Sequence, residues 1–282
     1  MRKTFLFCCC LYLVLAAKAQ VTSPTPTIQQ VKFRLDSLDY SLQKSSRWVL
    51  ENQFMSRVVS IGRDYDLKQS GTASQLVYYH KSGFWLSSIG YYLPGTTSKL
   101  PKVDIAGGYF TPLDEYLSAS FSYNHSLYFN KNDEGASWAT LKMLSTNWTI
   151  DARIMSFSPA FYYQIYETSS MAQFSLTASK YIEGQKPFLG GKLIVEPNFT
   201  WSIASRDRYY AANPDHPSGK IVRVVSYECV LPVTYKQVGV YSFTPRLHWS
   251  LPVNVLPFDG AEEKKSVFYF TANLNILLWR RW

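Results

Sequence analysis

Cysteine is scarce in this chain, and three of its four cysteines, residues 8–10, lie close to the N-terminus. These three fall inside an apolar run from Phe5 to Ala17. Beyond that run only Cys229 remains, and a single cysteine cannot form an internal disulfide. A fold built from the rest of the chain therefore has to be held by hydrogen bonds and packing rather than by crosslinks.

The N-terminal stretch has the layout of a secretory signal peptide. Basic Arg2 and Lys3 precede the apolar run, and Ala17-Lys18-Ala19 supplies the pattern of small residues that a signal peptidase cleaves. The run is shorter than the roughly 20 apolar residues that a membrane-spanning helix needs. We therefore expect residues 1–19 to be removed and the mature chain to begin at Gln20.

Long apolar runs are also absent after Gln20, although 46% of the chain is hydrophobic and 16% is aromatic, with 21 tyrosines. Such residues must be distributed along alternating strands. Tyrosine and tryptophan favour the membrane interface, so this composition suits the aromatic girdles of a transmembrane barrel. A secreted β-sandwich also alternates and uses tyrosine, so composition alone leaves that alternative open.

The C-terminal segment 266–282 shows the alternation most clearly. Polar side chains such as Thr271, Asn273 and Asn275 occupy one parity, and the opposite parity is apolar. The segment ends on tryptophan. The residues that form this apolar C-terminal pattern are Phe268, Phe270, Leu274, Ile276, Leu278 and Trp282.

The same alternation predicts twelve strands, and an even number lets both chain ends lie on one side of a membrane. Tight turns are expected at 81–83, 111–114 and 145–147, with longer loops at the opposite end. Ser158-Pro159 is the weakest point, because it could be a bulge or a turn, so ten or fourteen strands stay open. The predicted strands are 48–63, 72–80, 84–93, 102–110, 115–129, 137–145, 147–166, 171–182, 190–204, 220–231, 236–253 and 266–282.

Together, the signal peptide, the alternating strands and the aromatic C-terminal strand resemble a bacterial outer-membrane β-barrel. The resemblance implies an all-β fold, a transmembrane antiparallel up-and-down β-barrel, located in the outer membrane of a Gram-negative bacterium. It also implies contact with outer-membrane lipid and insertion by the barrel assembly machinery. Arg280 departs from the pattern, because it occupies the apolar parity near the end of the strand.

Residues 20–46 differ in kind from the barrel at 47–282. After a Ser-Pro-Thr-Pro spacer, apolar residues recur from Ile28 to Leu42 at the three-and-four spacing of one helix face. A short periplasmic amphipathic helix is therefore expected before the barrel. It could plug the lumen, lie on the inner leaflet, pack beneath the barrel, or bind an envelope protein partner through residues 28–42.

The sequence offers little that points to catalysis. Barrel esterases that act on lipids place histidine and serine two residues apart, and His216-Pro217-Ser218 has this spacing only inside a loop with proline and glycine. His125 and Ser126 are adjacent and should point to opposite faces. Scattered histidines predict no metal site or cofactor, and no basic run predicts nucleic acid binding. We therefore expect no enzyme.

Charged and amide side chains on the polar parity are expected to line the lumen. After removal of the signal peptide the chain keeps 26 basic and 20 acidic residues, a net charge of +6. The sequence favours a narrow pore or a transport-related protein for small solutes; the alternative is a non-conducting accessory or scaffold barrel that binds a larger envelope complex. The predicted lumen residues are Lys142, Asp151, Arg153, Lys192, Glu196, Asn198, Arg246, His248, Asn273 and Asn275.

Overall fold

The computed structural model describes residues 45–56, 70–92, 94, 102–114, 116–128, 142–152, 154–165, 170–184, 190–205, 222–237, 239–253 and 266–281. Among these residues no helix is long and apolar enough to cross a membrane. The regular elements are the strands β1 Ser46–Met55, β2 Gly71–Tyr79, β3 Phe84–Tyr92, β4 Lys102–Pro112, β5 Leu117–Tyr128, β6 Lys142–Asp151, β7 Ser156–Ile165, β8 Ser170–Ser179, β9 Ile182–Glu183, β10 Lys192–Val195, β11 Asn198–Ser205, β12 Val222–Gln237, β13 Tyr241–Pro252 and β14 Val267–Arg281.

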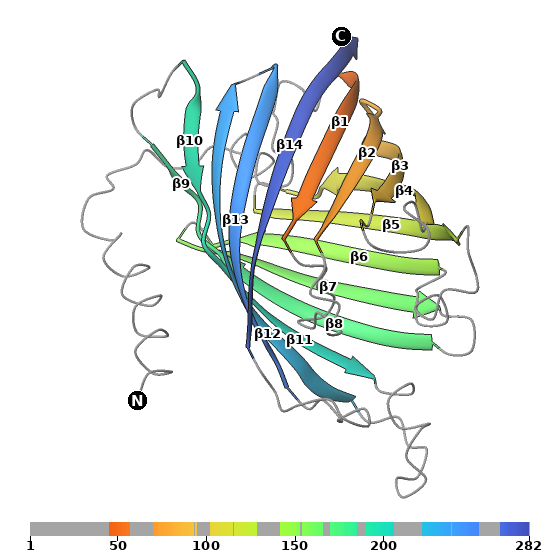
Figure 1. Ribbon diagram of the computed structural model, residues 1–282, viewed down its shortest axis with the longest axis vertical. Helices are drawn as coiled ribbons and strands as arrows, with labels where there is room; N and C mark the ends of the chain where they lie inside the picture. The colour runs from red at the N-terminus through yellow and green to blue at the C-terminus, as the bar shows by residue number, and fades with distance from the viewer. Residues whose placement is uncertain are drawn as a thin grey trace, which may run out of the picture.

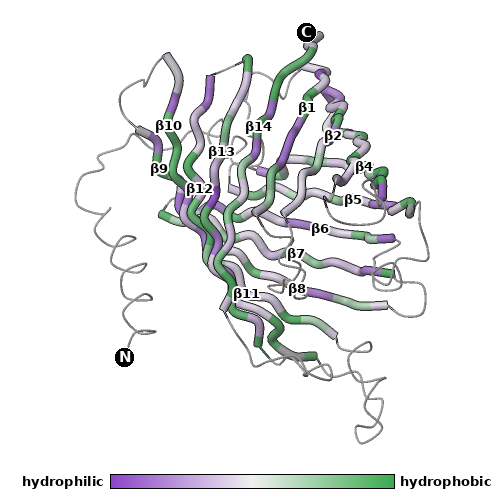
Figure 2. The backbone as a smooth tube through the Cα atoms, in the orientation of Figure 1, coloured by the Kyte–Doolittle hydropathy of each residue, from purple (hydrophilic) through white to green (hydrophobic). Residues whose placement is uncertain are grey.

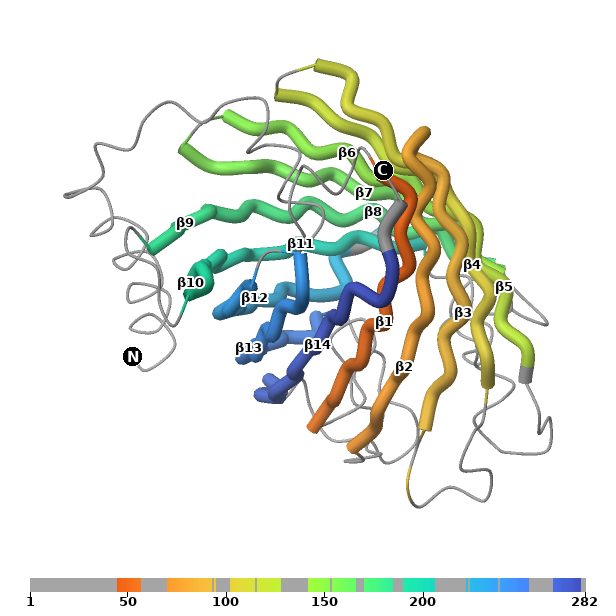
Figure 3. Tube along the Cα trace, turned by 90° about the horizontal axis from the view of Figure 1, so that it is seen from above, coloured from red at the N-terminus to blue at the C-terminus, as the bar shows by residue number. Residues whose placement is uncertain are grey.

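These strands close into a ring. From β1 to β8 each strand pairs antiparallel with the next, and β1 also pairs with β14 beside it (Figure 1). β11 pairs with both β8 and β12, which joins the two parts of the sheet. The short β9 and β10 pair with each other and prolong β8 and β11 at one end. The barrel wall is therefore formed by twelve strands, as the sequence predicted, and these strands curve around a common interior (Figure 3).

The apolar parity of the strands faces outward. Phe84 and Leu86 are 61% and 57% exposed, although a soluble protein would bury such side chains. Figure 2 shows apolar and polar residues alternating along the strands. An exposed apolar outer wall around a polar interior is the arrangement of an outer-membrane-type barrel and excludes the β-sandwich. Further exposed apolar side chains are Leu76, Ile105, Phe121, Leu144, Trp148, Phe161, Leu247 and Phe268.

The turns show how the barrel is oriented. Tight turns join β2 to β3, β4 to β5, β6 to β7 and β12 to β13 at one end. The connections 56–70 and 129–141 at the other end are much longer. Outer-membrane barrels keep short turns on the periplasmic side and long loops outside. We call these the turn end and the loop end.

The C-terminal strand changes its parity near its end. Phe268, Phe270, Leu274, Ile276 and Leu278 share the outward parity predicted for the C-terminal pattern. The β1–β14 register shifts between Trp48 and Val49, so Trp48 lies opposite Trp279 on the outer wall, and Arg280 lies opposite Arg47. This bulge shifts the parity of the backbone by one residue, so position 280 no longer continues the parity that runs from Phe268 to Leu278. Trp282 lies outside the described residues.

The turn between β6 and β7 spans 152–155, so the predicted turn at 145–147 is wrong. Ser145 lies within β6, opposite Ser122 of β5. The actual turn is closed by the Ala152 N–H, which donates to the Met155 carbonyl at 2.9 Å. It contains neither glycine nor proline, so no residue in it signals a turn. The predicted number of strands is still correct, because one turn separates β6 from β7 at a later position than predicted.

Two prolines lie inside strands instead of marking turns. Pro159 is within β7, where the β6–β7 ladder skips Trp148 and Thr149 before resuming at Ile150. Pro232 is within β12, and the following turn comes later, at 238–240. Proline cannot donate to a ladder, so each one locally weakens the pairing without ending the strand.

Two consecutive glycines in β4 face opposite walls. A Cβ on Gly108 would lie 2.4 Å from the Phe121 carbonyl oxygen and 2.7 Å from the Trp85 ring, which packs there on the interior side. A Cβ on Gly107 would meet its nearest atom, the Trp85 carbonyl oxygen, at an ordinary 3.4 Å. Gly108 is therefore required by close packing, whereas Gly107 leaves a hollow on the outer wall.

Several predictions lie outside the described residues. These are the signal peptide at 1–19, residues 20–44 of the spacer and amphipathic helix, the partner-binding segment 28–42 and His216-Pro217-Ser218.

Candidate functional site: the barrel interior

Serine and threonine line one side of the barrel interior. Their hydroxyls hydrogen-bond across neighbouring strands, as between Ser122 and Ser145, and between Thr177 and Thr200 at 2.8 Å. Because these side chains are short, this side leaves more space than long side chains would. The hydroxyl wall, from β5 to β8 and β11, comprises Ser118, Ser122, Ser126, Ser145, Thr149, Ser156, Ser175, Thr177, Thr200 and Ser202.

Long charged side chains occupy the other side, on β1, β12 and β13. Arg246 of β13 lies within electrostatic reach of Glu51 of β1 and Glu196, which follows β10. Glu196 in turn accepts a hydrogen bond from the Ser179 hydroxyl at 2.9 Å, which links this cluster to β8, one of the strands of the hydroxyl wall. Arg246 with Glu51 and Glu196 forms a charged cluster between the two ends, here called the central cluster.

A second polar network lies toward the loop end. The His248 ring is 3.0 Å from Glu228 through Nδ1 and 2.9 Å from the Thr271 hydroxyl through Nε2. The Tyr269 hydroxyl donates to the same Glu228 oxygen at 2.6 Å, and its ring stacks on His248 with centroids 4.2 Å apart. Glu228 is therefore the acceptor on which three strands converge.

Replacing Glu228 with leucine should lower the free energy of unfolding by about 2 kcal/mol, because His248 and Tyr269 would lose their shared acceptor. Urea titration of the refolded protein in lipid vesicles measures this. Thr234→Val is the matched control on β12, because it removes one hydroxyl contact of 2.9 Å with Thr244 and should cost less than half as much. Equal losses of unfolding free energy would show that the network around Glu228 stabilises the barrel no more than a single hydroxyl contact does.

A third group of charges lies nearer the loop end on β3 and β4. Asp104, only 2% exposed, accepts from the Tyr91 hydroxyl at 2.8 Å and pairs with Lys102 at 3.1 Å. The Lys102 ammonium also lies 4.4 Å from the centre of the Tyr91 ring. Both contacts fall on Oδ2 of Asp104, whereas its Oδ1 is buried without a hydrogen bond among the described residues.

The turn end of the interior is closely packed. Arg47 and Lys236 are 2% and 1% exposed, and the Arg47 guanidinium lies 4.4 Å above the Tyr79 ring. Val49 packs there against Tyr79 and Leu277. Long side chains therefore fill the interior at the turn end.

Most of the predicted lumen residues take interior positions. Lys192 lies on the same face at the turn end, where it pairs with Glu183 at 2.8 Å. Arg153 lies outside the described residues. The predicted residues that lie on the inward parity of a strand or contact an inward side chain are Asp151, Glu196, Asn198, Arg246, His248, Asn273 and Asn275.

Lys142 lies on the outer wall, so its predicted position in the lumen is wrong. It is on the same parity as exposed Leu144 and Trp148. Once the false turn at 145–147 is removed, residues 142 and 148 belong to one strand and must share a face. Lys142 is therefore a cation on the lipid-facing side.

The interior partners of these residues were not predicted from the sequence. They are Arg47, Glu51, Lys102, Asp104, Glu228, Lys236 and Tyr269. Lys102 and Asp104 are two apart on one strand, so their shared face could have been recognised. Glu228 and Tyr269 are 41 residues apart. Only the register of β12, β13 and β14 brings these two together.

Histidine and serine also lie two residues apart in His80-Lys81-Ser82 and in His248-Trp249-Ser250, where Ser250 is fully buried. His80 Nδ1 is 2.7 Å from the Ser82 hydroxyl in the exposed turn between β2 and β3. His125 faces outward and Ser126 inward, as their adjacency predicted. Within the described ranges no group of three or more histidine, cysteine or carboxylate residues could hold a metal ion.

No family model and no curated protein matches this sequence. Among solved structures the chain is similar to the KdgM porin, with 6% identity, a TM-score of 0.46 and coverage of 82% of this chain and 98% of the porin. It is also similar to LpxR from Salmonella typhimurium, with 10% identity, a TM-score of 0.45 and coverage of 81% and 99%.

A further similarity is to an outer membrane channel from Pseudomonas putida F1, with 10% identity, a TM-score of 0.40 and coverage of 83% and 96%. These TM-scores lie below 0.5, so the likenesses carry no evidence about function.

Proposed function

We propose that this chain is a narrow channel in the outer membrane for small polar solutes. The observation that supports it best is the closed ring of strands around an interior with short hydroxyls on one side and charged groups on the other. Such a wall can hydrate a passing solute, and charges along it set ion preference. Because both Arg246 and its carboxylate neighbours Glu51 and Glu196 are present, we expect only weak ion selectivity.

Swelling of liposomes that contain the refolded mature chain, residues 20–282, tests solute passage. Vesicles should swell with small sugars and stop swelling as the sugar grows, because a barrel of twelve strands has a narrow interior. Empty liposomes and liposomes with heat-denatured protein provide the baseline. Swelling no faster than the baseline for every sugar, with a folded barrel, would contradict a channel.

The alternative is a non-conducting barrel that binds an envelope complex through its N-terminal segment. Deleting residues 20–44 distinguishes the two roles. A segment that plugs the channel would slow swelling, so its removal would accelerate it. A segment that binds a partner would leave swelling unchanged and release that partner from the purified complex.

We further propose that the chain has no hydrolase activity. Thr271, His248 and Glu228 are spaced like a hydroxyl, a general base and its orienting carboxylate. However, Thr271 is 3% exposed, so a substrate cannot reach its hydroxyl. His80 and Ser82 contact each other in an exposed turn, with no carboxylate contact to His80 in the described part of the chain. Release of fatty acid from outer-membrane lipids by the purified barrel would contradict this proposal.

A further inference from the structure

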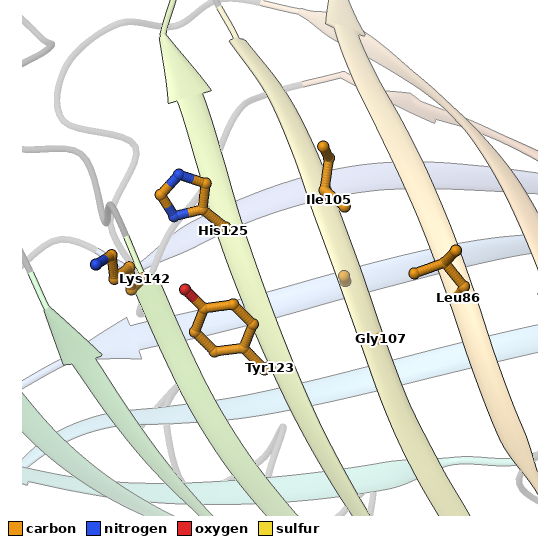
Figure 4. Close-up of a pocket in the computed structure, with 7 residues that line it drawn as sticks. Leu86, Ile105, Gly107, Tyr123, His125 and Lys142 are labelled. Carbon is orange, nitrogen blue, oxygen red and sulfur yellow. The ribbon is translucent and has the colours of Figure 1, made fainter.

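A groove of about 570 Å³ crosses the outer wall over β3 to β6. Figure 4 shows Leu86, Ile105 and Tyr123 around its floor at Gly107, with His125 and Lys142 at the end nearest the longer connections. The groove exists because Gly107 has no side chain to fill it. It lies on the lipid-facing wall, outside the channel described above.

The groove continues toward the turn end. A second hollow of about 700 Å³ shares Gly107 and Tyr123 with the first and runs on between Phe84, Phe121 and Leu144. Together the two hollows form an apolar furrow with a basic end. A furrow of this shape fits a molecule with an extended hydrocarbon chain and an anionic head.

The two basic side chains form a pair on the lipid-facing wall. His125 and Lys142 lie directly opposite each other in the β5–β6 register. Exposed Leu127 follows His125 on β5, and exposed Leu144 follows Lys142 on β6, so the pair lies within the apolar wall. Cationic side chains on the lipid face destabilise a barrel unless they lie near a membrane interface or meet an opposite charge.

Neither basic group has a partner among the described residues. The His125 Nδ1 atom is buried without a hydrogen bond, and Lys142 takes part in no salt bridge there. Because the wall covers Nδ1, a group outside the barrel can reach only the other ring nitrogen, Nε2, together with the Lys142 ammonium. Phosphate oxygens supply both the negative charge and the hydrogen-bond acceptors for an ammonium and a protonated imidazole.

We propose that this furrow binds a phosphorylated glycolipid of the outer leaflet. Its phosphate lies on His125 and Lys142, and one acyl chain lies along Gly107 between Leu86 and Tyr123. The basic pair is near the loop end of the barrel, which faces outward, so the lipid comes from the outer leaflet. This inference does not depend on whether the interior conducts.

Native mass spectrometry of the detergent-purified mature protein with bis-phosphorylated lipid A tests the proposal. We expect one lipid A molecule to stay bound, and at least tenfold weaker binding of the fully dephosphorylated lipid with the same acyl chains. Phosphatidylglycerol has a phosphate but no phosphorylated sugar, and it should also bind at least tenfold more weakly than bis-phosphorylated lipid A. Because these comparisons use the unaltered protein, they stay informative even if a variant fails to fold.

Variants locate the bound lipid. The double substitution His125→Leu with Lys142→Met should weaken lipid A binding at least tenfold, and Lys142→Arg alone should retain it. Gly107→Leu should weaken binding with both charges intact, because the new side chain fills the furrow. Lys192→Met is the matched control, since it removes an exposed lysine at the opposite end of the barrel.

Three results would overturn the proposal. The first is equal binding of phosphorylated and dephosphorylated lipid A. The second is unchanged lipid A binding in both the double variant and Gly107→Leu. The third is that the unaltered protein shows the mass of a dimer and no bound lipid, and that the dimer is lost in these variants. A second copy of the chain would then occupy the furrow.

Discussion

Gly108→Ala is expected to destabilise the barrel strongly, whereas Gly107→Ala, one residue earlier, is expected to leave its stability unchanged. A methyl group at Gly108 would lie 2.4 Å from the Phe121 carbonyl oxygen. That oxygen belongs to the paired β5 backbone and cannot move without breaking the β4–β5 ladder. The Trp85 ring on the other side, at 2.7 Å, would also have to leave its place.

The expected loss for Gly108→Ala is about 3 kcal/mol or more, because both overpacking and backbone displacement are required. Gel mobility of unboiled samples reports barrel formation, and urea titration in vesicles reports the free energy of unfolding. Gly107→Ala is the matched control, because its methyl group would meet its nearest neighbour at 3.4 Å and point outward. Equal stability of the two variants would mean that Trp85 does not pack over β4 as described.

Arg246→Met should shift the channel toward cations. The substitution leaves Glu51 and Glu196 without the guanidinium that balances them. One unit charge at about 6 Å in water contributes about 0.7 kcal/mol, which corresponds to about a threefold rise in the cation-over-anion permeability ratio. The reversal potential under a salt gradient measures that ratio.

Glu196→Gln should shift the same ratio in the opposite direction, and Arg246→Lys should leave it close to its original value because it keeps the charge. A reversal potential that is unchanged in both Arg246→Met and Glu196→Gln would place the central cluster outside the conduction path.

Alternation of side chains was enough to predict the barrel and its twelve strands. Each strand exposes apolar side chains to lipid and directs polar ones inward. The alternation can therefore be recognised in each segment of the sequence, as in the C-terminal strand with Phe268 and Phe270. The sequence was less informative about breaks between strands. Serine and asparagine at 145–147 look like a turn but occupy the interior, where hydroxyl and amide groups are also favoured.

That misplaced turn had a direct consequence for the site. It separated Lys142 from Trp148 and allowed Lys142 to be placed in the lumen, although both lie on the outer wall of β6. The basic pair with His125 on the lipid-facing side was hidden for the same reason. The parity of a residue assigns it to one wall only where the strand is continuous.

Contacts between strands could not be predicted, because they depend on register. Glu228, His248 and Tyr269 meet through three separate strands, and the bulge opposite Val49 changes which residues of β14 face outward. Alternation assigns each residue to a wall, but it does not say which neighbour lies beside it. The central cluster around Arg246 therefore emerged only from the structure.

Single-channel recording of the refolded protein without its predicted signal peptide, residues 20–282, in a planar bilayer tests the proposed function most directly. A narrow, closed barrel lined by hydroxyls and by charges of both signs predicts small discrete conductance steps with weak ion preference. A barrel that is folded by its gel mobility but produces no steps at any voltage would contradict the channel.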